Sequence, residues 1–189
     1  MALPSTIFKA ELNVADLDRH HYADHSLTIA RHPSETDERM MVRLLAFAFH
    51  AGDRLEFGRG LSTTEEPDLW EHDLTGRVLL WIDVGQPDER RVRKACAQSA
   101  RVAVYAYGPG RTVDLWWEKA SAELSRFDNL SVAALDPSAT ATLAAQAERT
   151  MRLQATIQDG DAWLSSGEER IPAVRRWLKG SPGDFLPER

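Results

Sequence analysis

The stretch LLWIDVGQPDERRVRKA (residues 79–95) decides the fold expected for this chain. Its first part is apolar almost throughout, which is typical of a central strand covered on both faces, and we predict a strand over residues 78–84. Pro87-Asp88-Glu89 then favours the start of a helix that runs to about Ser99, because proline suits the first helical turn. This unit places the chain in the α/β or α+β class.

Strands and helices are predicted on both sides of this unit. Alternating apolar and polar residues indicate a half-buried strand over residues 7–14 and a second strand that ends at about Ala30. Ser34 is the expected cap of a helix that runs to about Ala51 and ends at Gly52. Further along, we predict strands at 102–107, 112–117 and 130–135, a helix from 137 to about 149, a hairpin turning at 159–160, and a short helix with a tail over 172–189.

This order predicts one mixed β-sheet flanked by helices, with β-hairpins at the N- and C-terminal ends. The length of 189 residues and the 43% hydrophobic content fit a single domain over residues 1–189, in which about 170–189 forms a C-terminal extension. The net charge of −6 argues against a general nucleic-acid coat protein, so a polyanion would need a local basic patch. The single cysteine, Cys96, excludes an internal disulfide and a cysteine-based zinc site. Without a signal-peptide pattern or a long apolar run, we expect a cytoplasmic protein.

Two aspartates lie where the strand patterns require apolar side chains. Asp83 interrupts the apolar strand 78–84, and Asp68 begins the preceding strand, which we expect to pair with it in a hairpin. Any hairpin loop of even length puts both aspartates on one face, because directly paired residues project from the same face; an odd loop or a bulge would break this relation. Two neighbouring carboxylates repel each other unless a cation compensates them. A metal ion, an arginine or lysine, or backbone donors must therefore neutralise this pair.

Glu38 is the third acid in an apolar setting. At helical spacing it lies in line with an apolar stripe that must pack on the sheet, so we expect Glu38 to point toward the aspartates. Glu35 lies on the same side, nearer the solvated end. Mg²⁺ and Mn²⁺ prefer oxygen ligands, and such an ion readies a water for attack on a phosphodiester. The alternative is that each acid is bound by a nearby arginine; the candidates are Arg39, Arg43, Arg91 and Arg93.

These motifs together resemble the PD-(D/E)XK nuclease pattern, in which Pro67-Asp68 is followed by a hairpin and then by Asp83. Taken whole, the chain is similar to proteins of the YaeQ family. The stretches that carry this resemblance are HPSETDERMMVRLLAF (32–47), STTEEPDLW (62–70), LLWIDVGQPDERRVRKA (79–95) and RFDNLSV (126–132).

The resemblance implies a restriction-endonuclease-like variant of the PD-(D/E)XK fold. It also implies that Asp68 and Asp83 hold a metal ion, Mg²⁺ or Mn²⁺, and that Glu38 is the acid of the first helix. The nuclease pattern has a lysine two residues after the second acid, whereas this chain has Gly85. Gln86 and Lys94 are the candidates to assist the water instead, although glutamine supplies no positive charge.

A basic face on the helix after Pro87 is the candidate nucleic-acid contact. Arg91, Lys94 and Arg101 fall on one side at helical spacing, where a DNA or RNA backbone would dock; the alternative is a solvated charged face. Four histidines, His20, His21, His25 and His32, suggest a metal cluster, but His20 and His21 would face opposite sides of an extended strand and could not easily both ligate, so we predict that the four are surface residues.

Three functions follow from these patterns. The first is a Mg²⁺-dependent nuclease that hydrolyses nucleic-acid phosphodiesters. The second is a catalytically inactive binding or regulatory module on the same fold, which Gly85 and the acidic net charge favour. The third is a plain interaction protein whose acids are all salt-bridged. A stabilising response to metal, and cleavage of nucleic acid, separate the three.

Overall fold

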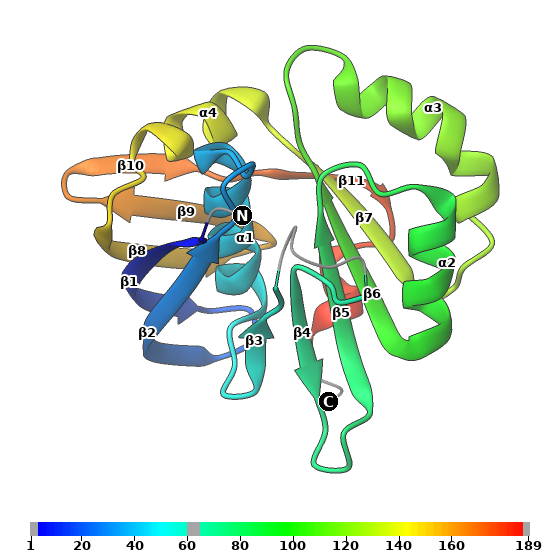
Figure 1. Cartoon of the computed structure of the whole chain (residues 1–189), viewed down its shortest axis with the longest axis horizontal. Helices are drawn as coiled ribbons and strands as arrows, with labels where there is room; N and C mark the ends of the chain where they lie inside the picture. The colour runs from blue at the N-terminus through cyan, green and yellow to red at the C-terminus, as the bar shows by residue number, and fades with distance from the viewer. Residues whose placement is uncertain (1–3, 60–64, 187–189) are drawn as a thin grey trace.

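The computed structural model describes residues 4–59 and 65–186, and these residues form two mixed β-sheets (Figure 1). The first sheet has five strands, in the spatial order β10 (Glu169–Pro172), β9 (Asp161–Ser166), β8 (Thr150–Gln158), β1 (Thr6–Asp16) and β2 (His21–Arg31). The second has six strands, in the order β11 (Arg175–Lys179), β7 (Leu130–Leu135), β6 (Ser99–Ala106), β5 (Val78–Val84), β4 (Leu69–His72) and β3 (Leu55–Phe57).

The predicted α+β class and the hairpins near the two ends of the chain, β1–β2 and β8–β9, are confirmed. The number of sheets is corrected from one to two. The two hairpins join each other through a parallel β1–β8 pair and form a sheet of their own. The strand pattern identified these hairpins, but it holds no information on which strands from distant parts of the chain pair with each other.

The helices lie between and outside the sheets. Helix α1 (Asp37–His50) lies between the two sheets with α4 (Pro137–Ala145) beside it, and α2 (Glu89–Gln98) and α3 (Thr112–Leu124) cover the outer face of the second sheet (Figure 1). A 3₁₀ helix spans Pro182–Phe185. No helix in the described part of the chain is both long and apolar enough to cross a membrane.

Helix α1 is buried on all sides, and this placement shapes the candidate site. Every residue from Met40 to His50 is buried, including Arg43 and His50, because one sheet packs on each side of the helix. The predicted helix is thus confirmed, but its N-cap is Thr36, whose side chain accepts a hydrogen bond from the Arg39 amide, and not Ser34.

Two other sequence predictions are wrong. Residues 112–117, predicted as a strand, begin α3, where the apolar residues Val113, Trp117, Ala120 and Leu124 recur at helical spacing. The segment predicted as a C-terminal helix forms β11 and the 3₁₀ helix, while residues 187–189 lie outside the described residues. The helix predicted to reach residue 149 ends at Ala145.

The C-terminal strand β11 covers the edge of β7, with which it pairs antiparallel. It is held from both sides. Arg176 binds Asp114 of α3 at 2.6 Å, and beyond the strand Ser131 of β7 donates a hydrogen bond to Asp184 at 2.6 Å. This cover leaves β3 and β11 as the outermost strands of the second sheet.

We predict that His50 makes the protein sensitive to acid. Its imidazole is buried and lies 2.6 Å from the Tyr105 hydroxyl; burial, and then the nearby positive charge of Arg19, hold the pKa of His50 well below its ordinary value of 6.5. Below about pH 6.5, His50 therefore binds a proton in the unfolded chain but stays unprotonated in the folded chain. The free energy of unfolding falls as the pH drops below about 6.5, by up to about 1.4 kcal/mol per pH unit.

Urea unfolding of the wild type and the His50→Gln variant between pH 7.5 and 5 measures this contribution. The variant is expected to be less stable at pH 7.5 but to lose less stability on acidification. Equal slopes for the two proteins would show that His50 is not the titrating group.

Candidate functional site

The β4–β5 hairpin brings the two aspartates to the same end of the second sheet, but not onto one face. Leu69 pairs with Ile82 and Trp70 with Trp81, a register that would set Asp68 opposite Asp83. Asp68, however, lies in a bend before β4, and its amide donates to the carbonyl of Ile82 at 3.0 Å. The hairpin register also shifts between Glu71 and His72, as at a β-bulge, so the strict pairing on which the shared-face prediction depended does not hold.

The backbone beside the bend at Asp68 is tightly packed. Gly58, which follows β3, donates its amide to the Asp68 carbonyl at 2.9 Å. A Cβ atom at Gly58 would lie 2.0 Å from the carbonyl oxygen of Pro67, so only glycine fits here. The position of Asp68 is therefore fixed by its backbone on both sides.

Asp68 turns toward α1. One carboxylate oxygen accepts a hydrogen bond from Arg39 Nη2 at 2.6 Å, and the other accepts from the backbone amide of Val84 at 2.8 Å. The side chain is only 2% exposed. Both oxygens thus already have donors supplied by the protein.

Asp83 lies with Trp81 on the opposite, α2-covered face of the sheet. Arg91 of α2 binds it through two parallel hydrogen bonds, Nε to Oδ2 at 2.8 Å and Nη2 to Oδ1 at 2.7 Å. Burial raises the pKa of the Asp83 carboxyl; the guanidinium of Arg91 opposes this rise, and the negative charge of Asp68 adds to it. The two aspartates therefore still sense each other, although each has its own arginine.

The acid that connects α1 to this region is Glu35, not Glu38. Glu35 precedes α1, and its side chain is fully buried, in contrast to its predicted place near the solvated end. It binds Arg43 through two hydrogen bonds of 2.8 Å and Arg39 at 3.1 Å. Arg39 thereby bridges Glu35 and Asp68.

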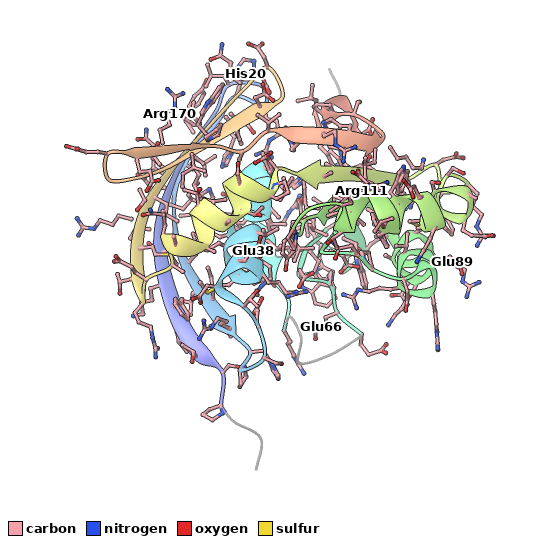
Figure 2. The ribbon with its side chains drawn as sticks, turned by 90° about the horizontal axis from the view of Figure 1, so that it is seen from above. His20, Glu38, Glu66, Glu89, Arg111 and Arg170 are labelled. Atoms are coloured by element: carbon pink, nitrogen blue, oxygen red, sulfur yellow. The ribbon has the colours of Figure 1, made fainter. Side chains whose placement is uncertain are left out.

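Glu38 makes its hydrogen bond on the other side of α1. Its carboxylate accepts from the hydroxyl of Thr140 on α4 at 2.7 Å, and Figure 2 shows Glu38 on α1 near the middle of the molecule. No hydrogen bond or ion pair in the described part of the chain joins Glu38 to the aspartates, although Glu38 and Asp68 both raise the pKa of Tyr107.

These contacts define an ion-pair chain that we call the arginine-acid chain: Arg43, Glu35, Arg39 and Asp68, followed by the pair Asp83 and Arg91. Three carboxylates meet three guanidinium groups, so the formal charge of the chain is zero. Among residues 4–59 and 65–186, no group of three or more His, Cys, Asp or Glu side chains is arranged to hold a metal ion. The donor set as it stands does not fit Mg²⁺ or Mn²⁺.

The two residues expected to assist a catalytic water also have other partners. Gln86 donates a hydrogen bond to the carbonyl of Tyr107, and Lys94 forms an ion pair with Glu65. Gly85, at the position of the nuclease lysine, has a positive φ of 98° that favours glycine. The backbone at this point therefore disfavours any side chain.

The predicted nucleic-acid face is likewise engaged in internal contacts. Arg91 binds Asp83 and also donates to the Glu66 carbonyl at 3.0 Å, and Arg101 donates to the Asp184 carbonyl at 3.1 Å. Figure 2 places Glu66 below the middle of the molecule and Glu89, the first residue of α2, at its right. Glu89 itself binds Arg126 at 2.7 Å, which further reduces the positive charge available on this side.

The alternative that arginines bind the acids holds for Arg39, Arg43 and Arg91, but the linkage of Glu35 to Asp68 through Arg39 was not predicted. A signal was present, since Glu35, Arg39 and Arg43 follow each other at intervals of four residues, and such residues are neighbours along a helix. Arg43 also lies within an otherwise apolar segment. A buried cation needs a buried anion, so this arginine pointed to an internal ion pair.

Comparison with known proteins places this arrangement in a family. The family model described as "YaeQ protein" matches residues 1–174. The uncharacterized YaeQ proteins of Escherichia coli K12 and Salmonella typhi are each 51% identical over 171 residues, which covers 90% of this chain and 94% of theirs.

Solved structures agree with the sequence match. The crystal structure of the YaeQ protein from Xanthomonas axonopodis pv. citri superposes with a TM-score of 0.89 at 50% identity, covering 93% of this chain and 99% of that one. The YaeQ protein from Pseudomonas syringae gives a TM-score of 0.91 at 41% identity, covering 96% of this chain and all of that one. The chain therefore belongs to the YaeQ family.

Proposed function

We propose that this protein is a non-catalytic binding module on a nuclease-like fold, in which arginines take the place that a metal ion has in a nuclease. One observation carries this proposal: all four carboxylate oxygens of Asp68 and Asp83 accept hydrogen bonds from the protein itself. The fold resemblance supplies the nuclease-like framework, and Gly85 at the lysine position is consistent with absent catalysis.

The energetics of buried charge support this reading. A buried carboxylate that loses its partner destabilises a protein by about 3–5 kcal/mol, because the charge stays out of water without compensation. A metal ion at Asp68 and Asp83 would have to displace Arg39 and Arg91, whose side chains are only 16% and 24% exposed. Displacement would take from each of these guanidinium groups its aspartate partner and leave Arg39 with Glu35 and Arg91 with the Glu66 carbonyl.

The second candidate is a Mg²⁺-dependent nuclease in which Asp68 and Asp83 hold the ion. It is favoured by the proximity of the two carboxylates, since the charge of Asp68 contributes to the raised pKa of Asp83. Binding of DNA or RNA through Arg91, Lys94 and Arg101 also stays a prediction. The internal contacts of all three residues weaken it.

The ion pair between Arg91 and Asp83 is expected to be essential for stability. Replacement of Arg91 by Met leaves Asp83 buried without a partner and should lower the free energy of unfolding by about 3–5 kcal/mol. A second change, Asp83→Asn, should restore a large part of this loss in the double variant. Urea denaturation measures both effects.

Arg93→Met is the matched control, because Arg93 lies on the same helix and is 56% exposed in its pair with Glu89. It should change stability by less than about 1 kcal/mol. If Arg91→Met is as mild as this control, Arg91 does not neutralise Asp83.

The response to divalent metal separates the two candidate functions. We expect Mg²⁺ and Mn²⁺ in millimolar excess to leave the melting temperature unchanged, and single-stranded and duplex DNA and RNA to remain intact. A ligand present at about 100 times its Kd would add about 2.7 kcal/mol, which a thermal scan detects readily.

A metal-dependent rise in melting temperature that is lost in the Asp68→Asn, Asp83→Asn double variant would support the nuclease instead. Glu56→Gln, which removes an exposed acid on β3, controls for loss of charge alone. Circular dichroism of each variant confirms that the fold is retained before its response is compared.

A further inference from the structure

Two histidines on β2 lie close together in an arrangement that the functions discussed above do not use. The Nε2 atoms of His21 and His25 are 3.2 Å apart, and their rings are stacked with centroids 5.5 Å apart and an interplanar angle of 23°. Both residues are half-buried, which corrects the prediction that they are simple surface residues. Ala23 lies between them on the same face of the strand, and its small side chain lets the imidazoles lean toward each other.

The surroundings fix these rings. Across the β1–β2 pair, His21 lies opposite Asp16 and His25 lies opposite Leu12, so the histidines lie on the face of the sheet that packs on the core. The edge of the His25 ring contacts the ring of Phe47 on α1, with centroids 5.2 Å apart and an angle of 77°. A ring held from one side by an aromatic contact and from the other by its neighbour has little rotational freedom.

We propose that His21 and His25 bind a divalent transition-metal ion, such as Zn²⁺, Ni²⁺ or Cu²⁺, through their Nε2 atoms. A Zn–N bond length of about 2.0–2.1 Å and tetrahedral angles place two ligand nitrogens about 3.3 Å apart, close to the distance seen here. The two nitrogens therefore need almost no rearrangement to receive an ion between them. Imidazole suits zinc, copper and nickel, whereas Mg²⁺ prefers oxygen.

The electrostatics of the site favour the neutral form of His25. Burial lowers the pKa of His25, and repulsion from His21 lowers it further, and the neutral form of imidazole is the one that binds metal. Asp53 and Asp24 raise the pKa of His25, and their negative charge would favour a cation beside the ring. The positive charge of Arg19 lowers this pKa and would disfavour such a cation. Asp16 is already bound to Arg19 at 2.6 Å.

The site offers two protein ligands, so water completes the coordination. No third His, Cys, Asp or Glu joins the pair within the ranges 4–59 and 65–186. Its affinity should therefore be lower than that of a closed site with four protein ligands. Protons compete with the metal for the same nitrogens, so binding should weaken as the pH falls through the range in which the histidines are protonated.

Calorimetric titration of the metal-free full chain with Zn²⁺ and with Ni²⁺ tests this proposal. One ion per chain is expected at pH 7.5, and the variants His21→Asn and His25→Asn should each lose at least about tenfold in affinity. His20→Asn and His32→Asn are the matched controls: these residues flank the same strand but lie outside the pair, and their replacement should leave the affinity unchanged.

Electron paramagnetic resonance of the Cu²⁺ complex gives an independent readout, since coupling to two imidazole nitrogens is expected in the wild type and to one in either variant. The proposal is overturned if no saturable binding occurs, or if the controls lose as much affinity as the pair variants; the 3.2 Å contact is then only a hydrogen bond between histidines. Because Mg²⁺ and Mn²⁺ probe the aspartates of the other sheet, this outcome is independent of the metal test above.

Discussion

The arginine-acid chain is the interaction on which the arrangement around α1 depends. Glu35 lies at the start of α1, and Arg43 lies on the buried side of the same helix. Arg39 links Glu35 to Asp68, which directly precedes β4 of the second sheet. Beyond its first turn, α1 is buried between the sheets, so a buried charge such as that of Arg43 must be compensated inside the protein. The same constraint applies to Asp83 and Arg91 on the opposite face of the second sheet.

In this arrangement the carboxylates form internal ion pairs, and this is the basis of the proposed non-catalytic role. In a metal-dependent nuclease, acids converge so that a cation neutralises them and activates water. Here the acids diverge, since Asp68 is directed to α1, Asp83 to α2 and Glu38 to α4. Two parallel hydrogen bonds from one guanidinium, as between Arg91 and Asp83, make a strong and specific ion pair. Asp68 and Asp83 are thus compensated by donors within the protein.

Sequence reasoning recovered most elements and the unusual positions of the acids, but not their orientation. The strand 78–84 was predictable because its apolar run is typical of a central strand. Helix α1 was predictable because its apolar residues recur at helical spacing. Asp68 lies in a bend before β4, where strand alternation does not fix the direction of its side chain toward Arg39 and the Val84 amide. The direction of Glu38 depends on α4, which lies about a hundred residues later in the chain. Likewise, the contact between His21 and His25 requires strand curvature and a small residue between them, which alternation alone does not describe.

A crystal structure determined after soaking with Mn²⁺ tests the central claim most directly, because anomalous scattering locates the ion without assumptions about function. The account predicts no anomalous peak between Asp68 and Asp83, with Arg91 still bound to Asp83 through both hydrogen bonds. A strong peak within coordination distance of both aspartates, with Arg39 and Arg91 displaced from them, would contradict it and restore the metal-dependent nuclease.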